Sequence, residues 1–227
     1  MWLRFTDRGQ ALQPGSAQMI GAMLLGALLL CHGCAGSGSA RRPSPQEPET
    51  ALGPLVTAPV QAAYDRALAA MAGGNLVEAE LALEQFVLEY PHLVGAYVNL
   101  AIVYERDNRH DEAHAVLDQA LSINPTHAPA NNQLGILLRK QGQFAEAEQA
   151  YRRAIDAEPE YALAHHNLGV LLDLYLQRPA DALEHYQRYQ DSLAEPDAAV
   201  ARWIIDLRRR LGITDDTAAR VVQEESS

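Results

Sequence analysis

One short segment of the sequence carries residue types that could bind a metal ion. His110 and His114 are four residues apart, and two histidines at that spacing share one face of a helix. In zinc proteases of this pattern a glutamate directly follows the first histidine and acts as the general base, but Asp111 stands there in this chain. A zinc hydrolase is therefore disfavoured. A packing role for His110 is the alternative that the surrounding pattern must decide.

The two cysteines of the chain, Cys31 and Cys34, have the spacing of a redox pair or of half a metal site. A redox pair would need a βαβ context, and a metal site would need a second pair of ligands. The sequence provides neither, so modification of a single thiol becomes the preferred interpretation.

No other pattern in the chain indicates catalysis. The sequence lacks a glycine-rich phosphate loop, a Gly-x-Ser-x-Gly turn and a paired Ser and Lys. His165 and His166 are adjacent, but His165 takes a position that packing explains. Acidic side chains are spread over solvent-facing helix positions, so no pair is held as a general acid and base. The net charge of −11 argues against nucleic acid, because phosphate binding needs clustered Lys and Arg. We therefore expect a non-enzymatic protein with no cofactor, metal or nucleic acid.

The N-terminal segment has the organisation of a secretion signal. Arg4 and Arg8 precede an uncharged apolar run at 19–30, which is too short to cross a bilayer because a spanning helix needs about 20 residues. Gly33-Cys34-Ala35 then resembles the lipobox of bacterial lipoproteins, in which the cysteine becomes the lipidated first residue of the mature chain. The resemblance implies a signal peptide over 1–34 and lipidation at Cys34. Simple signal cleavage and an uncleaved anchor are the alternatives.

Residues 35–59 have the composition of a linker. The stretch is rich in Pro, Ser, Gly and Glu, and such a composition buries too little apolar surface to offset chain entropy. We expect a disordered, semi-extended tether between the anchor and the folded part of the chain.

A 34-residue period runs through most of the remaining sequence. Leu134-Gly135 recurs as Leu168-Gly169, and Pro91, Pro125 and Pro159 keep the same offset. Between these markers lie two stretches with helical spacing of apolar residues. They are joined by a turn at Gly142 or Asn108, residue types that tolerate positive φ. A fixed period of this length indicates helix pairs stacked into a solenoid.

The pattern resembles the tetratricopeptide repeat. Unit 128–161 matches the consensus of that family at Leu134, Gly135, Ala147, Tyr151, Ala154 and Pro159, and unit 94–127 matches at Tyr97, Leu100, Ala101, Tyr104, Ala113, Ala120 and Pro125. The resemblance implies an all-α, right-handed α-solenoid of about four helix pairs, at 60–93, 94–127, 128–161 and 162–195. An amphipathic helix at 196–211 would cap the array, and 212–227 would form a frayed tail.

The repeat register decides two local questions. His110 takes the position of Leu76 and Phe144 in the neighbouring units, which predicts packing and not metal binding. In the last unit Ala182 arrives one residue late, so 177–179 should form a lengthened turn. The capping helix should bury one apolar stripe, made of Val200, Trp203, Ile204, Leu207 and Leu211.

The resemblance also implies a binding surface. In the family, positions 5, 9, 12 and 13 of the first helices help to line a concave groove. Here they are Val98, Ile102, Glu105 and Arg106; Asn132, Ile136, Arg139 and Lys140; and His166, Val170, Asp173 and Leu174. The aliphatic strip at position 9, with charges beside it, suits an extended or helical protein segment. Packing of an adjacent helix on this strip, such as the capping helix, is the alternative.

These expectations combine into one functional prediction. We expect a lipid-anchored adaptor or scaffold that binds a protein segment in its groove during assembly or operation of a cell-envelope complex. The resemblance to lipoproteins implies an outer-membrane anchor facing the periplasm, if the cell is Gram-negative. A self-associating structural module without a dedicated peptide ligand is the alternative, so a homo-oligomer stays open.

Overall fold

The computed structural model describes residues 57–213, and every regular element in this range is an α-helix. Nine helices follow one another: α1 (Ala58–Ala72), α2 (Leu76–Glu89), α3 (Val94–Arg106), α4 (His110–Ile123), α5 (Ala128–Lys140), α6 (Phe144–Ala157), α7 (Ala162–Leu174), α8 (Pro179–Asp191) and α9 (Ala198–Arg210). The predicted signal peptide, the lipidation site at Cys34, nearly all of the predicted tether and most of the predicted tail lie outside the described residues.

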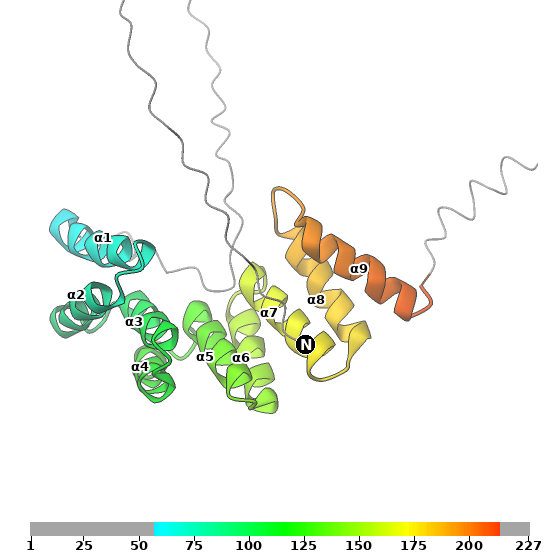
Figure 1. Cartoon of the computed structure of the whole chain (residues 1–227), viewed down its shortest axis with the longest axis horizontal. Coiled ribbons are helices and arrows are strands. Elements are labelled where there is room, and N and C mark those ends of the chain that lie inside the picture. The colour runs from blue at the N-terminus through cyan, green and yellow to red at the C-terminus, as the bar shows by residue number, and fades with distance from the viewer. Residues whose placement is uncertain (1–56, 214–227) are drawn as a thin grey trace, which may run out of the picture. The chain divides into compact units, whose positions relative to one another are not determined.

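The helices are arranged as a stack of pairs (Figure 1). Packing is most extensive within the pairs α1–α2, α3–α4, α5–α6 and α7–α8, and the second helix of each pair also contacts the next element in the chain. The first helices additionally contact one another, α3 with α5 and α5 with α7. This order of contacts confirms the predicted all-α repeat fold. Within 57–213 none of the helices combines the length and the apolar character that a membrane crossing requires.

The turns inside the pairs depend on residues in the left-handed region. Gly74 (φ 73°), Asn108 (φ 62°) and Gly142 (φ 78°) each lie between the two helices of a unit. The fourth unit differs, because α7 ends at Leu174 and α8 begins only at Pro179, and here Gln177 adopts φ 53°. The lengthened turn of this unit thus has the location that the late arrival of Ala182 indicated.

The helices of each pair approach through a small residue on the first and a large residue on the second. A Cβ atom built on Gly135 would lie 2.5 Å from Cε1 of Tyr151, and one built on Gly169 would lie 2.7 Å from the ring of Tyr186. Units with alanine at the first position carry leucine at the second, and all four side chains are fully buried: Ala67 with Leu83 and Ala101 with Leu117. Backbone separation and side-chain volume are therefore matched within each unit.

Buried polar side chains link one unit to the next. The sixth residue of each later unit donates to a first helix of the preceding unit: Asn99 Nδ2 to Tyr64 Oη (2.6 Å), Gln133 Nε2 to Glu105 Oε2 (2.6 Å) and Asn167 Nδ2 to Asn132 Oδ1 (3.0 Å). Since unsatisfied amides are costly in an apolar interior, this series favours one register between neighbouring units.

The prolines near the ends of the units also accept hydrogen bonds, through their carbonyl oxygens. The fourth residue of each later unit donates to the carbonyl oxygen of the proline that ends the preceding unit: Tyr97 to Pro91 (3.3 Å), Asn131 to Pro125 (2.9 Å) and His165 to Pro159 (2.8 Å). His165 is 3% exposed, so its place at this position is explained by packing and by this bond.

Candidate protein-binding surface

The predicted groove residues lie on α3, α5 and α7, and they differ widely in exposure. Val98, Ile102, Asn132, Ile136 and Glu105 are between 1% and 4% exposed. Arg139, His166, Val170 and Asp173 are half-buried, whereas Arg106 and Lys140 are exposed. A role for the strip Ile102, Ile136 and Val170 in binding stays a prediction. The half-buried residues gather toward α7.

Two of the predicted residues form an ion pair between neighbouring units. The Lys140 ammonium contacts the Glu105 carboxylate, whose second oxygen accepts a hydrogen bond from Gln133. The Glu105 side chain is 2% exposed and that of Lys140 is 44% exposed. The Glu105 carboxylate thus holds α3 against α5, and of these two charged groups only the Lys140 ammonium is accessible to solvent.

Arg139 connects the middle of this surface to the last unit. Its Nε atom lies 3.4 Å from the Tyr151 hydroxyl, and its guanidinium lies 5.7 Å from the centre of the Tyr175 ring. Tyr175 is 42% exposed, and its ring centre lies 4.8 Å from that of Phe144 with the two ring planes tilted by 41°. This contact orients a cation over an aromatic face.

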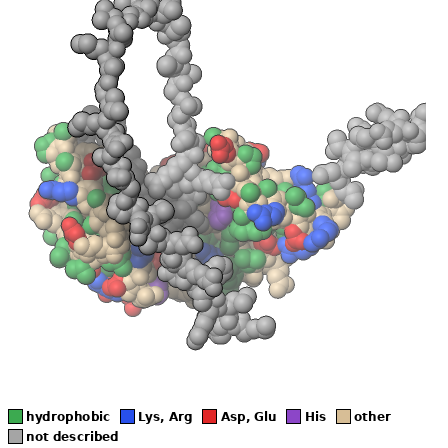
Figure 2. Space-filling view, turned by 45° about the horizontal axis from the view of Figure 1, so that its top comes forward, with side chains coloured by type: hydrophobic (Ala, Val, Ile, Leu, Met, Phe, Trp, Pro, Cys, Tyr) green, Lys and Arg blue, Asp and Glu red, His purple; other side chains and the backbone are tan. Residues whose placement is uncertain are grey.

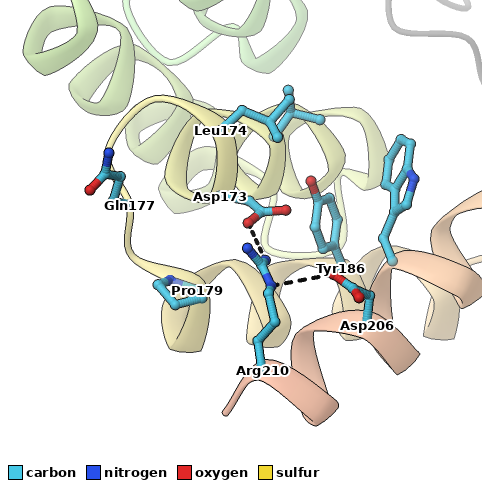
Figure 3. Close-up of a pocket in the computed structure, with 9 residues that line it drawn as sticks. Asp173, Leu174, Gln177, Pro179, Tyr186, Asp206 and Arg210 are labelled. Carbon is cyan, nitrogen blue, oxygen red and sulfur yellow. Dashed lines mark hydrogen bonds and ion pairs between the residues drawn. The ribbon is translucent and has the colours of Figure 1, made fainter.

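The remaining predicted residues meet the capping helix around an open cavity of about 790 Å³ (Figure 3). Val170 and Asp173 of α7 contribute to one wall, with Leu174 beside them. The lining is completed by Gln177, Pro179, Tyr186, Trp203, Asp206 and Arg210. Three sequence-predicted groove positions therefore share one cavity with side chains from α8 and α9.

The polar side of the cavity is an arginine between two carboxylates. Arg210 lies 2.5 Å from Asp173 and 3.3 Å from Asp206, so it joins the last turn of α9 to α7 (Figure 3). The hydrogen bond with Asp173 raises the pKa of Arg210, which stays charged at all physiological pH values. Arg209 also contacts Asp206, at 2.5 Å, so the two carboxylates at this corner are matched by two arginines.

The apolar side of the cavity is aromatic. Trp203 lies 5.4 Å from Tyr186 and 6.0 Å from His166, measured between ring centres, and His166 also meets Tyr189 edge-on at 4.9 Å. Burial lowers the pKa of His166 below its ordinary value, so this imidazole is neutral near pH 7. Because Trp203 is 41% exposed and Leu174 is 67% exposed, apolar surface remains open to solvent at the mouth.

Trp203 is the cavity residue that the sequence pattern placed differently. The pattern assigned it to the buried stripe of the capping helix, but the stripe is centred on Val200 and Leu207, each 1% exposed. Trp203 lies at the edge of that stripe, and its ring faces the cavity instead of the core. Its position at the margin of the helical stripe was the available signal, since an amphipathic ring tolerates partial exposure.

In the described part of the chain, no further potential metal ligands are grouped with the paired histidines of α4. His110 is half-buried, as are Leu76 and Phe144 at the same position in the neighbouring units. His114 contacts Asp118 through Nδ1 at 3.2 Å. Between residues 57 and 213, no three His, Cys, Asp or Glu side chains are grouped so that they could hold a metal ion.

Comparison with known protein families identifies the repeat. Two tetratricopeptide-repeat models match the chain, one over residues 96–158 and the other over 132–199. The chain is a tetratricopeptide-repeat protein. Proteins built from this repeat typically act as non-enzymatic scaffolds that bind other proteins, and the cavity described above lies within the matched region except for its α9 side. No curated protein matches the chain.

Several solved structures share the fold. Pseudomonas aeruginosa PilF is 24% identical with a TM-score of 0.60, and the similarity covers 66% of this chain and 68% of that one. MamA is 20% identical with a TM-score of 0.55, covering 65% and 85% of the two chains. A Thermobaculum terrenum O-GlcNAc transferase is 26% identical with a TM-score of 0.53 over 61% of this chain, which spans only 28% of the transferase chain. The fold is therefore shared with chains that it covers for the most part and with a larger enzyme of which it covers a small part.

Proposed function

We propose that this tetratricopeptide-repeat protein is a lipid-anchored adaptor that binds a segment of a cell-envelope protein at the cavity between α7, α8 and α9. The observation that carries the proposal is the open aromatic and aliphatic wall of this cavity, opposite a corner of ordered ion pairs. Large apolar side chains that stay exposed beside ordered charges are typical of a surface that a partner completes.

The cavity defines the chemistry of the segment. Trp203 and Leu174 offer apolar contacts for one large side chain of the partner. Both oxygens of Asp206 contact arginines of α9, Arg209 and Arg210, so the polar corner offers hydrogen bonds but no excess charge to a partner. We therefore propose a segment with an apolar anchor followed closely by a polar residue.

Crosslinking at a defined atom tests the binding site. A photoreactive amino acid replaces Leu174 in the full chain, which is expressed in its native cells and irradiated in intact membranes. The same amino acid at Ala145, an exposed position on α6, serves as the matched control. We expect a discrete adduct from position 174 only, and we expect Trp203→Ala to reduce its yield by about tenfold, the effect of losing one large buried contact. An adduct that forms equally at position 145, or that persists with Trp203→Ala, would refute the site.

The lipid anchor is tested separately. Cys34 follows Gly33 at the end of the apolar run, which is the feature that supports lipidation. In cells fed a clickable fatty acid, we expect labelling of the wild-type chain and of Cys31→Ser, and loss of labelling together with membrane release in Cys34→Ser. If Cys34→Ser stays labelled, Cys34 is not the acceptor.

A further inference from the structure

The outer face of α2 carries apolar side chains that the repeat does not require. Val77, Leu81 and Leu88 are the second, sixth and thirteenth residues of this helix, and they are 69%, 63% and 81% exposed. Helical spacing places all three on one face, opposite the buried residues Ala79, Leu83 and Phe86. We call Val77, Leu81 and Leu88 the α2 face.

The other units provide an internal comparison for this surface. The second, sixth and thirteenth residues of α4, α6 and α8 are exposed in every case, and none is large and apolar: Asp111, Ala115 and Ser122; Ala145, Gln149 and Asp156; and Ala180, Glu184 and Asp191. Four equivalent helices thus present these positions to solvent, and only α2 fills them with Val and Leu. Packing inside the repeat therefore does not account for the α2 face.

The charge of α2 restricts what can cover this face. The helix contains four glutamates and no lysine or arginine. Glu80 pairs with Arg109 at 2.6 Å, whereas Glu78 and Glu89 bond to the neutral amides of Asn75 and Gln85. A partner that is apolar and positively charged would satisfy both properties, and two copies of α2 facing each other would repel.

The last helix of the same chain has the complementary character. The outer face of α9, which consists of Ala198, Arg202, Ile205 and Arg209, is exposed along its length, and Ile205 is 66% exposed. Helix α9 carries four arginines and one aspartate. Lys and Arg side chains gather at the end of the array where α9 lies (Figure 2). Helix α2 belongs to the first pair of the stack, and α9 is the last helix (Figure 1). Several helices therefore separate the two surfaces within one chain.

We propose that the α2 face of one copy docks on the outer face of α9 of a second copy. Such an interface is heterologous, because the two surfaces differ, and an assembly keeps one unused surface at each of its two ends. The chain therefore associates head to tail into short, concentration-dependent oligomers. Neither surface includes a residue that lines the cavity between α7, α8 and α9. This inference and the adaptor proposal can therefore be tested independently of each other.

The test uses three variants of the full chain in a non-ionic detergent, followed by sedimentation velocity from micromolar to several hundred micromolar concentrations. Leu81→Glu disrupts the α2 face, and Ile205→Glu disrupts the α9 face. Ala115→Glu is the matched control, because Ala115 occupies the place of Leu81 on α4. We expect mass to rise with concentration in the wild type and in the control. Each of the other variants should associate at least about tenfold more weakly, the loss that follows from removing one buried leucine-sized contact.

Mixing the two disrupted variants gives the sharpest result. Each retains one intact surface, so an equimolar mixture should form a dimer and nothing larger. A wild-type chain that is monomeric throughout the range overturns the proposal, as does a mixture that does not pair. If Leu81→Glu lowers the melting temperature without changing the mass, the α2 face is covered from within its own chain, and the proposal is again wrong.

Discussion

The match between a glycine on one helix and a tyrosine on the next can be tested by a double-mutant cycle. The Cβ atom of Gly135→Ala would lie 2.5, 2.6 and 2.9 Å from three ring carbons of Tyr151, a side chain with no exposed surface. Carbon atoms in contact prefer about 3.5–4.0 Å, so the ring or the helix must move by about 1 Å. Overpacking of this kind costs about 1–3 kcal/mol, and the higher helix propensity of alanine offsets about 1 kcal/mol of it.

The second arm of the cycle removes the ring. Tyr151→Leu takes away buried aromatic volume, and we expect it to cost about 2–4 kcal/mol. In the double variant the new Cβ atom enters the space that the ring has left. Alanine opposite leucine is the pair that this chain already uses at Ala67 and Leu83 and at Ala101 and Leu117. The double variant should therefore be more stable than the sum of the two single effects by about 1–3 kcal/mol.

Urea unfolding of the full chain, followed by far-ultraviolet circular dichroism, measures each corner of the cycle. Gly142→Ala is the control, because a Cβ atom there meets nothing within 4 Å and its cost arises only from the positive φ of 78°. Its effect should add to that of Tyr151→Leu within about 0.5 kcal/mol. If Gly135→Ala and Tyr151→Leu are equally additive, the close approach of α5 and α6 is not limited by this pair, and the reasoning is refuted.

Two further predictions concern buried polar groups. Burial and the neighbouring His165 lower the pKa of His185 to about 4, and the two Nδ1 atoms lie 2.9 Å apart. Because the folded pKa is below the unfolded value of about 6.5, the contribution of neutral His185 is complete above pH 6.5 and is lost as the pH falls toward 4. His185→Gln should therefore lose about 1–2 kcal/mol less stability than the wild type between pH 7 and pH 4, after allowance for partial solvent screening. Equal losses would contradict the assignment, and His92→Gln, at an exposed position, is the control. Asn167→Ala should lower the free energy of unfolding by about 1–3 kcal/mol, because the Asn132 carbonyl oxygen stays buried without this donor. Gln149→Ala, on an exposed helix face, should change it by less than about 0.5 kcal/mol, and similar losses for both would mean that the amide series contributes nothing specific.

The fold could be predicted because the same local pattern of residues recurs in several units. Leucine, small residues and prolines at fixed offsets indicated helix pairs, and the one-residue delay before Ala182 indicated the long turn between α7 and α8. The register also placed His110 with Leu76 and Phe144 and so weakened the metal interpretation. These inferences depend on contacts within a unit or between adjacent units, which a period in the sequence expresses directly.

The binding surface could be predicted only in part, because it depends on helices that are not related by the repeat. Position counting identified Val170, Asp173 and Leu174, but it could not show that Trp203 and Arg210 of α9 face them across a cavity. It also could not show that the two carboxylate oxygens of Glu105 are bound by Lys140 and Gln133. Both outcomes follow from the direction in which side chains leave neighbouring helices.

The amino-acid sequence by itself determined the repeat, its helix pairs and the matching of small and large residues, because these are set by contacts that recur every 34 residues. Only the tertiary structure decided which groove positions border an open cavity and that α2 alone presents large apolar residues where α4, α6 and α8 present small or polar ones. The physical reason is that exposure is a property of the whole assembly of helices. A leucine has the same local preference in a core and on a surface, and only its neighbours in space distinguish the two.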